Sequence, residues 1–340
     1  MSTCISIRTD LSDKAIEAWK HFVEGHNYGN LFQSFPMYEC YLQTKGHLPF
    51  LLFAYDKDEF VGVLLADIIS DGSAIKKGFS TRSIIIGGPL AKDNNAKIVD
   101  ELLRAYNEKI DKRVIYTQIR NQFDQLPIND SFQHNGYKFE PHLNFLVSLD
   151  SEENIWGRMG KGRTKQIKKA QKNGLAVSAH LPGEISNELI EKGYDVIRDV
   201  YRHAGLPLTS KELMMRVNEA SKLVLFFVKD LQGSVLGCRF ALLSGRCLYG
   251  WYAGSYRKYL NLYPNDMLIW ETLKWGCNHH YEYFDYGGAG NPNQPYGVRD
   301  FKAQAGGQLV NFGRYQCVHD KLRMFIGTVG MSFYKKLRKK

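Results

Sequence analysis

Apolar and polar segments alternate along the chain in an order that occurs twice. In the first half, the apolar runs Leu48–Tyr55 and Phe60–Ile69 flank a short charged turn, which predicts a hairpin of two antiparallel strands. A strand over Ser83–Ile86, an amphipathic helix over roughly Asn94–Lys109 and a strand over Arg113–Arg120 follow. The pattern therefore predicts hairpin, strand, helix and strand, with the helix as a crossover connection.

The second half repeats this order. Its predicted elements are the strands Leu223–Val228, Val235–Leu243 and Cys247–Ala253, a helix over roughly Pro264–Asn278 and the strand Tyr281–Tyr286. A helix leads each half, over Ser12–Glu24 and Ile185–Tyr201. This order of elements resembles the α/β unit of the N-acetyltransferase superfamily. By that resemblance we expect an α/β fold of two tandem N-acetyltransferase-like (acyl-CoA N-acyltransferase) domains, with mixed sheets flanked by helices. The alternative is a coincidental order, because many α+β domains contain a hairpin and a crossover.

The boundary between the two predicted domains lies where the strand Asn144–Leu149 gives way to an acidic segment. This places the first domain at residues 1–149 and the second, which carries the candidate active site, at residues 150–319. A further helix is predicted over about residues 320–340, and we expect it to pack on the first domain.

The net charge is +10, which favours anionic partners such as phosphorylated small molecules, nucleic acid or an acidic membrane surface. The six cysteines form no C-x-x-C pair, so we expect free thiols in a reducing cytosol and no metal site. No apolar run approaches the length of about 18 residues that a membrane span needs. These features predict a cytoplasmic protein.

A glycine-rich segment carries the strongest chemical signal. The stretch Tyr283–Gly290 runs from an aromatic strand into glycines, and Gly297–Lys302 follows with a single lysine after an apolar residue. Glycine lets backbone N–H groups approach a ligand closely, and a lysine supplies charge for a phosphate or a developing oxyanion. The alternative is a tight turn beside a solvated lysine.

Six basic residues lie between Lys161 and Lys172, in a segment that ends at Gly174. They predict a basic helix that could bind a diphosphate or an RNA backbone, or that simply presents a solvated face. The preceding glycines have P-loop spacing, but Arg163 occupies the position of the P-loop lysine, which argues against a nucleotide hydrolase. The segment Tyr256–Asn261, before the predicted second helix, lacks the glycines of a standard coenzyme A turn.

Four segments together resemble the FemABX family, whose members are peptidyltransferases that add amino acids to peptidoglycan precursors. They are Leu31–Ser34 with Tyr38, Arg163–Leu175, Pro264–Glu271, and Phe284–Gly288 with Gly297–Lys302 and Gly306–Gly307. The resemblance covers nearly the whole chain. The sequence departs from the family pattern at Ala305, where phenylalanine is expected, and it has no room for a long helical arm between Gly174 and Leu223.

By this resemblance, Phe301 and Lys302 are the catalytic candidates, with Lys302 close to the acyl carbonyl and stabilising the transition state. The candidate substrate-binding residues are Arg163, Lys161, Lys165, Tyr252, Tyr256, Asp285, Tyr286, Gly287, Gly288, Arg299, Gln33 and Ser34. Arg163 would bind a diphosphate of the acceptor. No metal is expected among these groups.

The resemblance implies an acyltransferase that transfers an aminoacyl or acyl group to an amine of a cell-envelope precursor of peptidoglycan type. The donor would be aminoacyl-tRNA or acyl-CoA, with no tightly bound cofactor, and the acceptor would be phosphorylated or lipid-linked. The basic end Lys335–Lys340 is either a solvated tail or a peripheral contact with acidic lipid at the inner face of the membrane. We expect a monomer. The alternatives are an acyl-CoA-dependent N-acyltransferase of surface-polysaccharide synthesis and a non-catalytic RNA- or membrane-binding protein.

Overall fold

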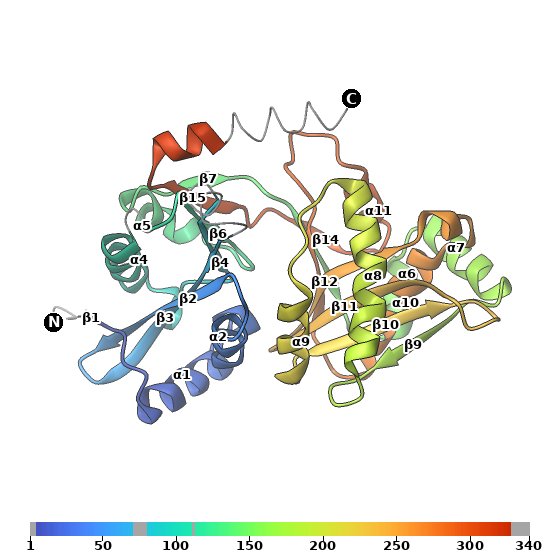
Figure 1. Cartoon of the computed structure of the whole chain (residues 1–340), viewed down its shortest axis with the longest axis horizontal. Coiled ribbons are helices and arrows are strands. Elements are labelled where there is room, and N and C mark those ends of the chain that lie inside the picture. Colours follow the sequence, from blue (N-terminus) through green and yellow to red (C-terminus); the bar gives the residue numbers. More distant parts are fainter. Residues whose placement is uncertain (1–4, 71–79, 111–112, 328–340) are drawn as a thin grey trace. The chain divides into compact units, whose positions relative to one another are not determined.

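The computed structural model describes residues 5–70, 80–110 and 113–327 (Figure 1). The chain divides into two compact units, each with its own sheet. The first comprises residues 1–141 and 312–340, and the second comprises residues 142–311.

The first unit is built on a mixed sheet with the strand order β1-β2-β3-β4-β6-β15-β7, in which β5 pairs with β3. Its elements are β1 (Ile5–Arg8), α1 (Asp13–Gly25), the 3₁₀ turn η1 (Leu31–Gln33), α2 (Phe35–Leu42), β2 (His47–Asp56), β3 (Glu59–Ile69), β4 (Arg82–Ile86), β5 (Leu90–Ala91), α4 (Ala96–Ile110), β6 (Tyr116–Arg120), α5 (Asn129–His134), β7 (Lys138–Glu140) and β15 (Arg314–Val318). Strands β4 and β6 run parallel, and the other neighbouring pairs are antiparallel.

The second unit has the strand order β9-β10-β11-β12-β13-β8-β14, with β12 and β13 parallel. Its elements are β8 (Asn144–Ser148), α6 (Glu152–Arg158), α7 (Lys161–Lys172), β9 (Ala176–His180), α8 (Asn187–Ala204), α9 (Lys211–Glu219), β10 (Leu223–Lys229), β11 (Val235–Ser244), β12 (Cys247–Ser255), η4 (Arg257–Leu262), α10 (Pro264–Asn278), β13 (Tyr283–Gly288), α11 (Gly297–Ala303) and β14 (Gln308–Val310).

The two units repeat one another, which confirms the predicted tandem α/β fold. Strands β2, β3, β4 and β6 correspond in order to β10, β11, β12 and β13, and a crossover helix joins the parallel pair in each unit. Helix α10 has the bounds that its apolar pattern predicts. The basic segment also forms the predicted helix, α7.

The domain boundary differs from the sequence-based one, because each sheet takes a strand from an unexpected part of the chain. Strand β8, predicted in the first domain, pairs with β13 and β14 of the second sheet. Residues 314–318 fall in the predicted second domain, but they form strand β15, which pairs with β6 and β7 of the first sheet. In each unit, the second strand of the parallel pair, β6 or β13, has one edge that its parallel partner does not cover. The backbone N–H and C=O groups of that edge need hydrogen-bond partners, which β15 and β8 supply. Residues 321–327 begin the predicted C-terminal helix, whereas Lys335–Lys340 lie outside the described residues.

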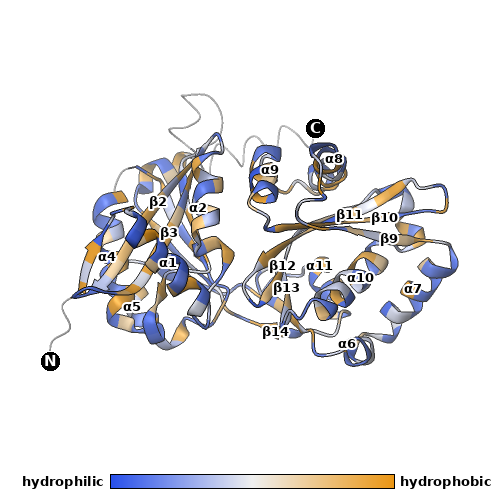
Figure 2. Cartoon of the chain, turned by 90° about the horizontal axis from the view of Figure 1, so that it is seen from below, coloured by the Kyte–Doolittle hydropathy of each residue, from blue (hydrophilic) through white to orange (hydrophobic). Residues whose placement is uncertain are grey.

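Helices cover both faces of the second sheet (Figure 2). Helices α8 and α9 pack on one face, against β10, β11 and β12. Helix α10 packs on the opposite face, where α6 and α7 join its apolar cluster. Gly193 allows α8 to approach the sheet closely, since a Cβ there would lie 2.7 Å from the ring of Phe240. These layers hold β12 and β13 in place from both sides.

Candidate functional site

The two parallel strands of the second sheet separate towards their carboxyl ends. Strands β12 and β13 pair only from Cys247 to Tyr249 and from Tyr283 to Asp285. Beyond these residues neither strand pairs with the other. A register shift between β11 and β12 leaves Trp251 as an extra residue, which is a bulge that bends β12. The result is an opening between two central strands.

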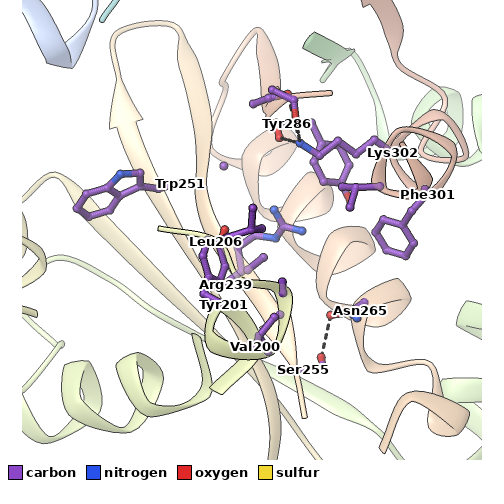
Figure 3. A pocket seen from close by; sticks show the side chains of 18 of the residues that line it. Val200, Tyr201, Leu206, Arg239, Trp251, Ser255, Asn265, Tyr286, Phe301 and Lys302 are labelled. Carbon is purple, nitrogen blue, oxygen red and sulfur yellow. Dashed lines mark hydrogen bonds between the residues drawn. The ribbon is translucent and has the colours of Figure 1, made fainter. Parts of the chain in front are cut away.

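A cavity of about 660 Å³ occupies this opening (Figure 3). Val200 and Tyr201 of α8 line it from one face of the sheet, whereas Asn265 of α10 and Lys302 of α11 line it from the other. A second hollow of about 520 Å³ shares Asn265 with it. The cavity therefore extends through the gap between the strands, and its volume is typical of a small-molecule site.

The ammonium of Lys302 lies at the end of β13. Its Nζ donates to the carbonyl oxygens of Tyr286 at 2.5 Å, Gly287 at 3.2 Å and Gly288 at 2.8 Å. Burial lowers the Lys302 pKa to about 8, because an apolar surrounding disfavours the charged form; Arg239 lowers it further and Asp285 raises it. Three carbonyls use the three donors of the ammonium. Lys302 thus holds the end of β13 in place, and its positive charge can stabilise a negative charge on a molecule in the cavity.

Asp285 organises the same strand end from inside the sheet. Its Oδ1 accepts hydrogen bonds from the Gly287 N–H at 2.7 Å and from Asn144 Nδ2 at 3.4 Å. Burial raises the Asp285 pKa to about 6, against the opposing effects of the Gly287 N–H, Lys302 and Asn144. Gly287 has φ +69°, a left-handed conformation that favours glycine. The sequence-predicted group of Asp285, Tyr286, Gly287, Gly288 and Lys302 is therefore brought together.

These two titrations predict a bell-shaped pH dependence of transfer. As the pH falls through about 6, Asp285 gains a proton and its bond from Gly287 weakens. As the pH rises through about 8, Lys302 loses its charge. We expect kcat/KM to be highest between these values. Asp285→Asn should remove the acidic limb and keep the basic limb; a profile that the substitution leaves unchanged would contradict the assignment.

Arg163, the predicted diphosphate ligand, has internal partners in the structure. Its side chain is fully buried, and its guanidinium donates to Asp266 and to the carbonyl of Phe301. It also lies 3.8 Å from the centroid of the Phe301 ring. Phe301 itself lines the cavity. Arg163 connects α7, α10 and α11 beneath the site, and a ligand could reach it only by displacing Asp266.

Other basic candidates also lie away from the cavity. Lys161 and Lys165 are exposed on α7, and neither is among the described residues that line the cavity. Arg299 donates to the carbonyls of Ala289, Asn291, Pro292 and Gln294, so it holds the loop that follows β13. The contacts of Arg299 are internal, and they stabilise the loop between β13 and α11.

The tyrosine candidates neighbour the cavity without lining it. Tyr252 Oη accepts a hydrogen bond from the Thr209 N–H at 3.3 Å. Tyr256 follows β12, and its backbone N–H bonds to the carbonyl of Leu236. The neighbouring residues Trp251 and Ser255 do line the cavity. Strand alternation and the bulge at Trp251 thus turn the two tyrosines away from it.

Gln33 and Ser34 belong to the first unit and have structural contacts. The fully buried Gln33 amide donates to the carbonyls of Leu65 and Ile86 and accepts from the Leu65 N–H. Ser34 Oγ donates to the Leu31 carbonyl at 2.7 Å. Gln33 therefore connects the ends of β3 and β4 inside the first unit, and the structure gives it no exposed side-chain atom for a ligand.

Sequence reasoning missed several lining residues, among them Arg239, Ser255 and Asn265. Ser255 Oγ donates to Asn265 Oδ1 at 2.8 Å, which ties β12 to the start of α10. Arg239 is the one that a sequence signal could have indicated. It is a charged residue in the middle of an otherwise apolar strand run.

Within residues 5–70, 80–110 and 113–327, no group of three or more His, Cys, Asp or Glu side chains is arranged to hold a metal ion. In the same ranges, no helix is both long and apolar enough to cross a bilayer. The five cysteines of the described part are free thiols: Cys40, Cys238, Cys247, Cys277 and Cys317.

A model of the acetyltransferase (GNAT) domain matches residues 165–302, from α7 to Lys302. The second unit is a GNAT-type acyltransferase domain. Among solved structures, FemX is similar over 95% of this chain and 100% of its own, with a TM-score of 0.72 and 14% identity. This likeness confirms a FemABX-like fold. Among curated protein sequences, none matches this chain significantly.

Two further structures share the tandem architecture. One is a C-terminal domain from Agrobacterium fabrum assigned as a lysylphosphatidylglycerol synthetase, with a TM-score of 0.57, 11% identity and coverage of 94% of each chain. The other is a tandem GNAT protein from the clavulanic acid biosynthesis pathway, with a TM-score of 0.58, 8% identity and coverage of 93% of this chain and 98% of its own.

The departures from the FemABX pattern have structural counterparts. Ala305, at the position where the family has phenylalanine, is buried in the core of the GNAT-type unit. The segment in which some members carry a long helical arm contains β9, α8 and α9. Both helices pack on the sheet, so this part of the chain completes the domain.

Proposed function

We propose that this GNAT-type domain transfers an aminoacyl group to an amine of a cell-envelope precursor of peptidoglycan type. The observation that carries the proposal is the cavity between the separated strands β12 and β13, with Lys302 at its base. The FemABX-like fold and the similarity to a protein assigned as a lysylphosphatidylglycerol synthetase support aminoacyl transfer in the envelope. Since tRNA is aminoacylated in the cytosol, the reaction would take place at the cytoplasmic side.

In this proposal the acceptor amine attacks the acyl carbonyl, and a tetrahedral intermediate with an oxyanion forms. Its collapse breaks the ester bond to the tRNA, and the tRNA hydroxyl leaves with the proton that the amine gives up. The charge of Lys302, which is buried at the base of the cavity, stabilises the oxyanion. The narrow gap orients the two reactants, which lowers the entropic part of the barrier. The imidazole of His203 lines the cavity, and its Nδ1 lies 2.7 Å from the carbonyl oxygen of Asp199, which leaves Nε2 to accept a proton.

The start of α10 supports aminoacyl-tRNA over acyl-CoA as the donor. In acetyltransferases of this superfamily, the corresponding helix start binds the coenzyme A diphosphate. Here Pro264 has no N–H, and the N–H groups of Asp266 and Met267 donate to the Tyr263 carbonyl at 3.2 and 3.3 Å. The Asp266 carboxylate adds negative charge, which Arg163 already neutralises. A diphosphate would find few free donors there.

A second candidate is acyl-CoA-dependent N-acylation in surface-polysaccharide synthesis; an acyl-CoA donor would be consistent with the match to the acetyltransferase domain. The two candidates differ in donor and in acceptor. The basic surface alone would also fit an RNA- or membrane-binding protein, but such a protein has no need for a lysine that is buried at the base of a cavity.

The test supplies the full-length protein with either ¹⁴C-aminoacyl-tRNA or ¹⁴C-acetyl-CoA. Each donor is combined with nucleotide-linked peptidoglycan precursors, amino sugars or no acceptor. We expect label to move from aminoacyl-tRNA to a peptidoglycan precursor. Transfer from acetyl-CoA to an amino sugar would support the second candidate, and no transfer from either donor would contradict both.

A further inference from the structure

Arg239 is a buried cation without an anionic partner. It lies on β11 with 4% of its surface exposed; its guanidinium lies over the rings of Phe284 and Tyr286 and forms no ion pair with any residue in the described ranges. Its Nε is buried and unsatisfied. The equally buried Arg163 has Asp266 as its partner. An isolated buried charge is costly, so an unpaired one is expected mainly where a ligand supplies the opposite charge.

The guanidinium of Arg239 faces the cavity beside a second unsatisfied group. Its Cζ lies 5.2 Å from the centroid of the Tyr286 ring and 5.4 Å from that of Phe284, and it points towards Tyr286 in Figure 3. The buried Tyr286 Oη also has no hydrogen-bond partner. Burial raises the Tyr286 pKa, against the opposing effects of the nearby Arg239 and Arg163, so its hydroxyl keeps its proton and can donate. Two donor groups are thus left for one ligand.

The charge around the cavity indicates how many negative charges that ligand carries. The described lining residues include Arg239, Arg257 and Lys302 and no acidic side chain. Arg257 is exposed, so water screens its charge. The Lys302 charge is balanced by three carbonyls and by the nearby Asp285. Arg239 therefore contributes one uncompensated buried charge, which matches a carboxylate better than a phosphate group of nearly two charges.

We propose that Arg239 and Tyr286 bind a carboxylate of the acceptor substrate. This inference rests on the proposed function, because the chemistry of acyl transfer decides whether the carboxylate belongs to the donor or to the acceptor. The carboxyl group of an aminoacyl or acyl donor is bound in an ester or thioester and carries no charge. A free carboxylate in the cavity then belongs to the acceptor, which is an amino acid or a peptide that bears the reacting amine. A planar guanidinium suits two-point binding of such a group.

The test measures thermal unfolding of the full-length protein with N-acetylglycine, with its neutral amide N-acetylglycinamide, or with inorganic phosphate. We expect N-acetylglycine at a saturating concentration to raise the unfolding temperature by about 2–4 °C over the amide. Equal effects of the acid and the amide would overturn the proposal. A larger increase with phosphate than with the acid would overturn the choice of a carboxylate.

Two arginine variants separate binding from structure. Arg239→Met removes an unpaired charge, so without ligand it should unfold at or above the wild-type temperature, and the difference between acid and amide should vanish. Arg163→Met is the matched control, because it removes an equally buried but paired arginine, and its unfolding temperature should fall. If Arg239→Met is destabilised as strongly as Arg163→Met, Arg239 is structural and the proposal fails.

This binding test is independent of transfer activity. If the protein binds the acid through Arg239 but transfers no label, the proposed function fails and the carboxylate site stands. If label moves from aminoacyl-tRNA while Arg239→Met retains the wild-type KM for the acceptor, the carboxylate site fails and the proposed function stands.

Discussion

Replacing Lys302 with methionine is expected to lower kcat for transfer by about 10²–10³-fold, the effect of removing one group that stabilises an oxyanion. Methionine has a similar length but lacks the charge. It also leaves the carbonyls of Tyr286, Gly287 and Gly288 without their shared donor. Both changes act at the reacting centre, so the loss should be in kcat more than in KM. Steady-state kinetics with the labelled donor measures it.

The matched control is Lys165→Met, which removes an exposed lysine of α7 outside the cavity. It should retain the wild-type kcat. A thermal unfolding curve verifies that Lys302→Met remains folded. Wild-type kcat in a folded Lys302→Met protein would refute the assigned role of Lys302.

Replacing Arg163 with methionine is expected to lower the free energy of unfolding of the second unit by about 3–5 kcal/mol. The substitution leaves the buried Asp266 carboxylate without its ion pair and the Phe301 carbonyl without its donor. Burial already raises the Asp266 pKa, and without Arg163 this carboxyl would gain a proton more readily. Denaturant unfolding followed by far-ultraviolet circular dichroism measures the loss.

Two further variants test this explanation. Arg158→Ala removes an exposed ion pair with Asp150 and should cost about 1 kcal/mol or less. The double variant Arg163→Met with Asp266→Leu should recover part of the lost stability, because no unpaired charge remains. A cost for Arg163→Met as small as that for Arg158→Ala would contradict the structural role.

The fold could be predicted because its elements have clear local patterns. The apolar runs that form β2, β3, β10 and β11 end at charged turns or glycines, and α10 begins at a proline. The exchange of β8 and β15 between the two sheets was not predictable from local patterns. Which strand completes a sheet edge depends on tertiary pairing, and both strands are short segments of five residues.

The site was predictable in part for a similar reason. The glycines and Lys302 lie in one segment, so their proximity follows from the chain itself. By contrast, the sequence does not reveal that Arg163 meets Asp266, about a hundred residues away, or that Arg299 bonds to its own loop. The same limit concealed Arg239, whose importance lies in having no anionic partner and an unsatisfied Nε in the described structure. Charged residues can be located in a sequence, but their partners are fixed only by the fold.

The central claim is that transfer takes place in the cavity between β12 and β13, and filling that cavity tests it most directly. Ala253 of β12 lines the cavity, directly opposite Arg239 in the strand register. Ala179→Trp is the matched control, because it makes the same substitution at an exposed position of β9 that does not line the cavity. Label transfer should be lost in a folded Ala253→Trp protein and retained in Ala179→Trp. Wild-type transfer by Ala253→Trp would contradict the account.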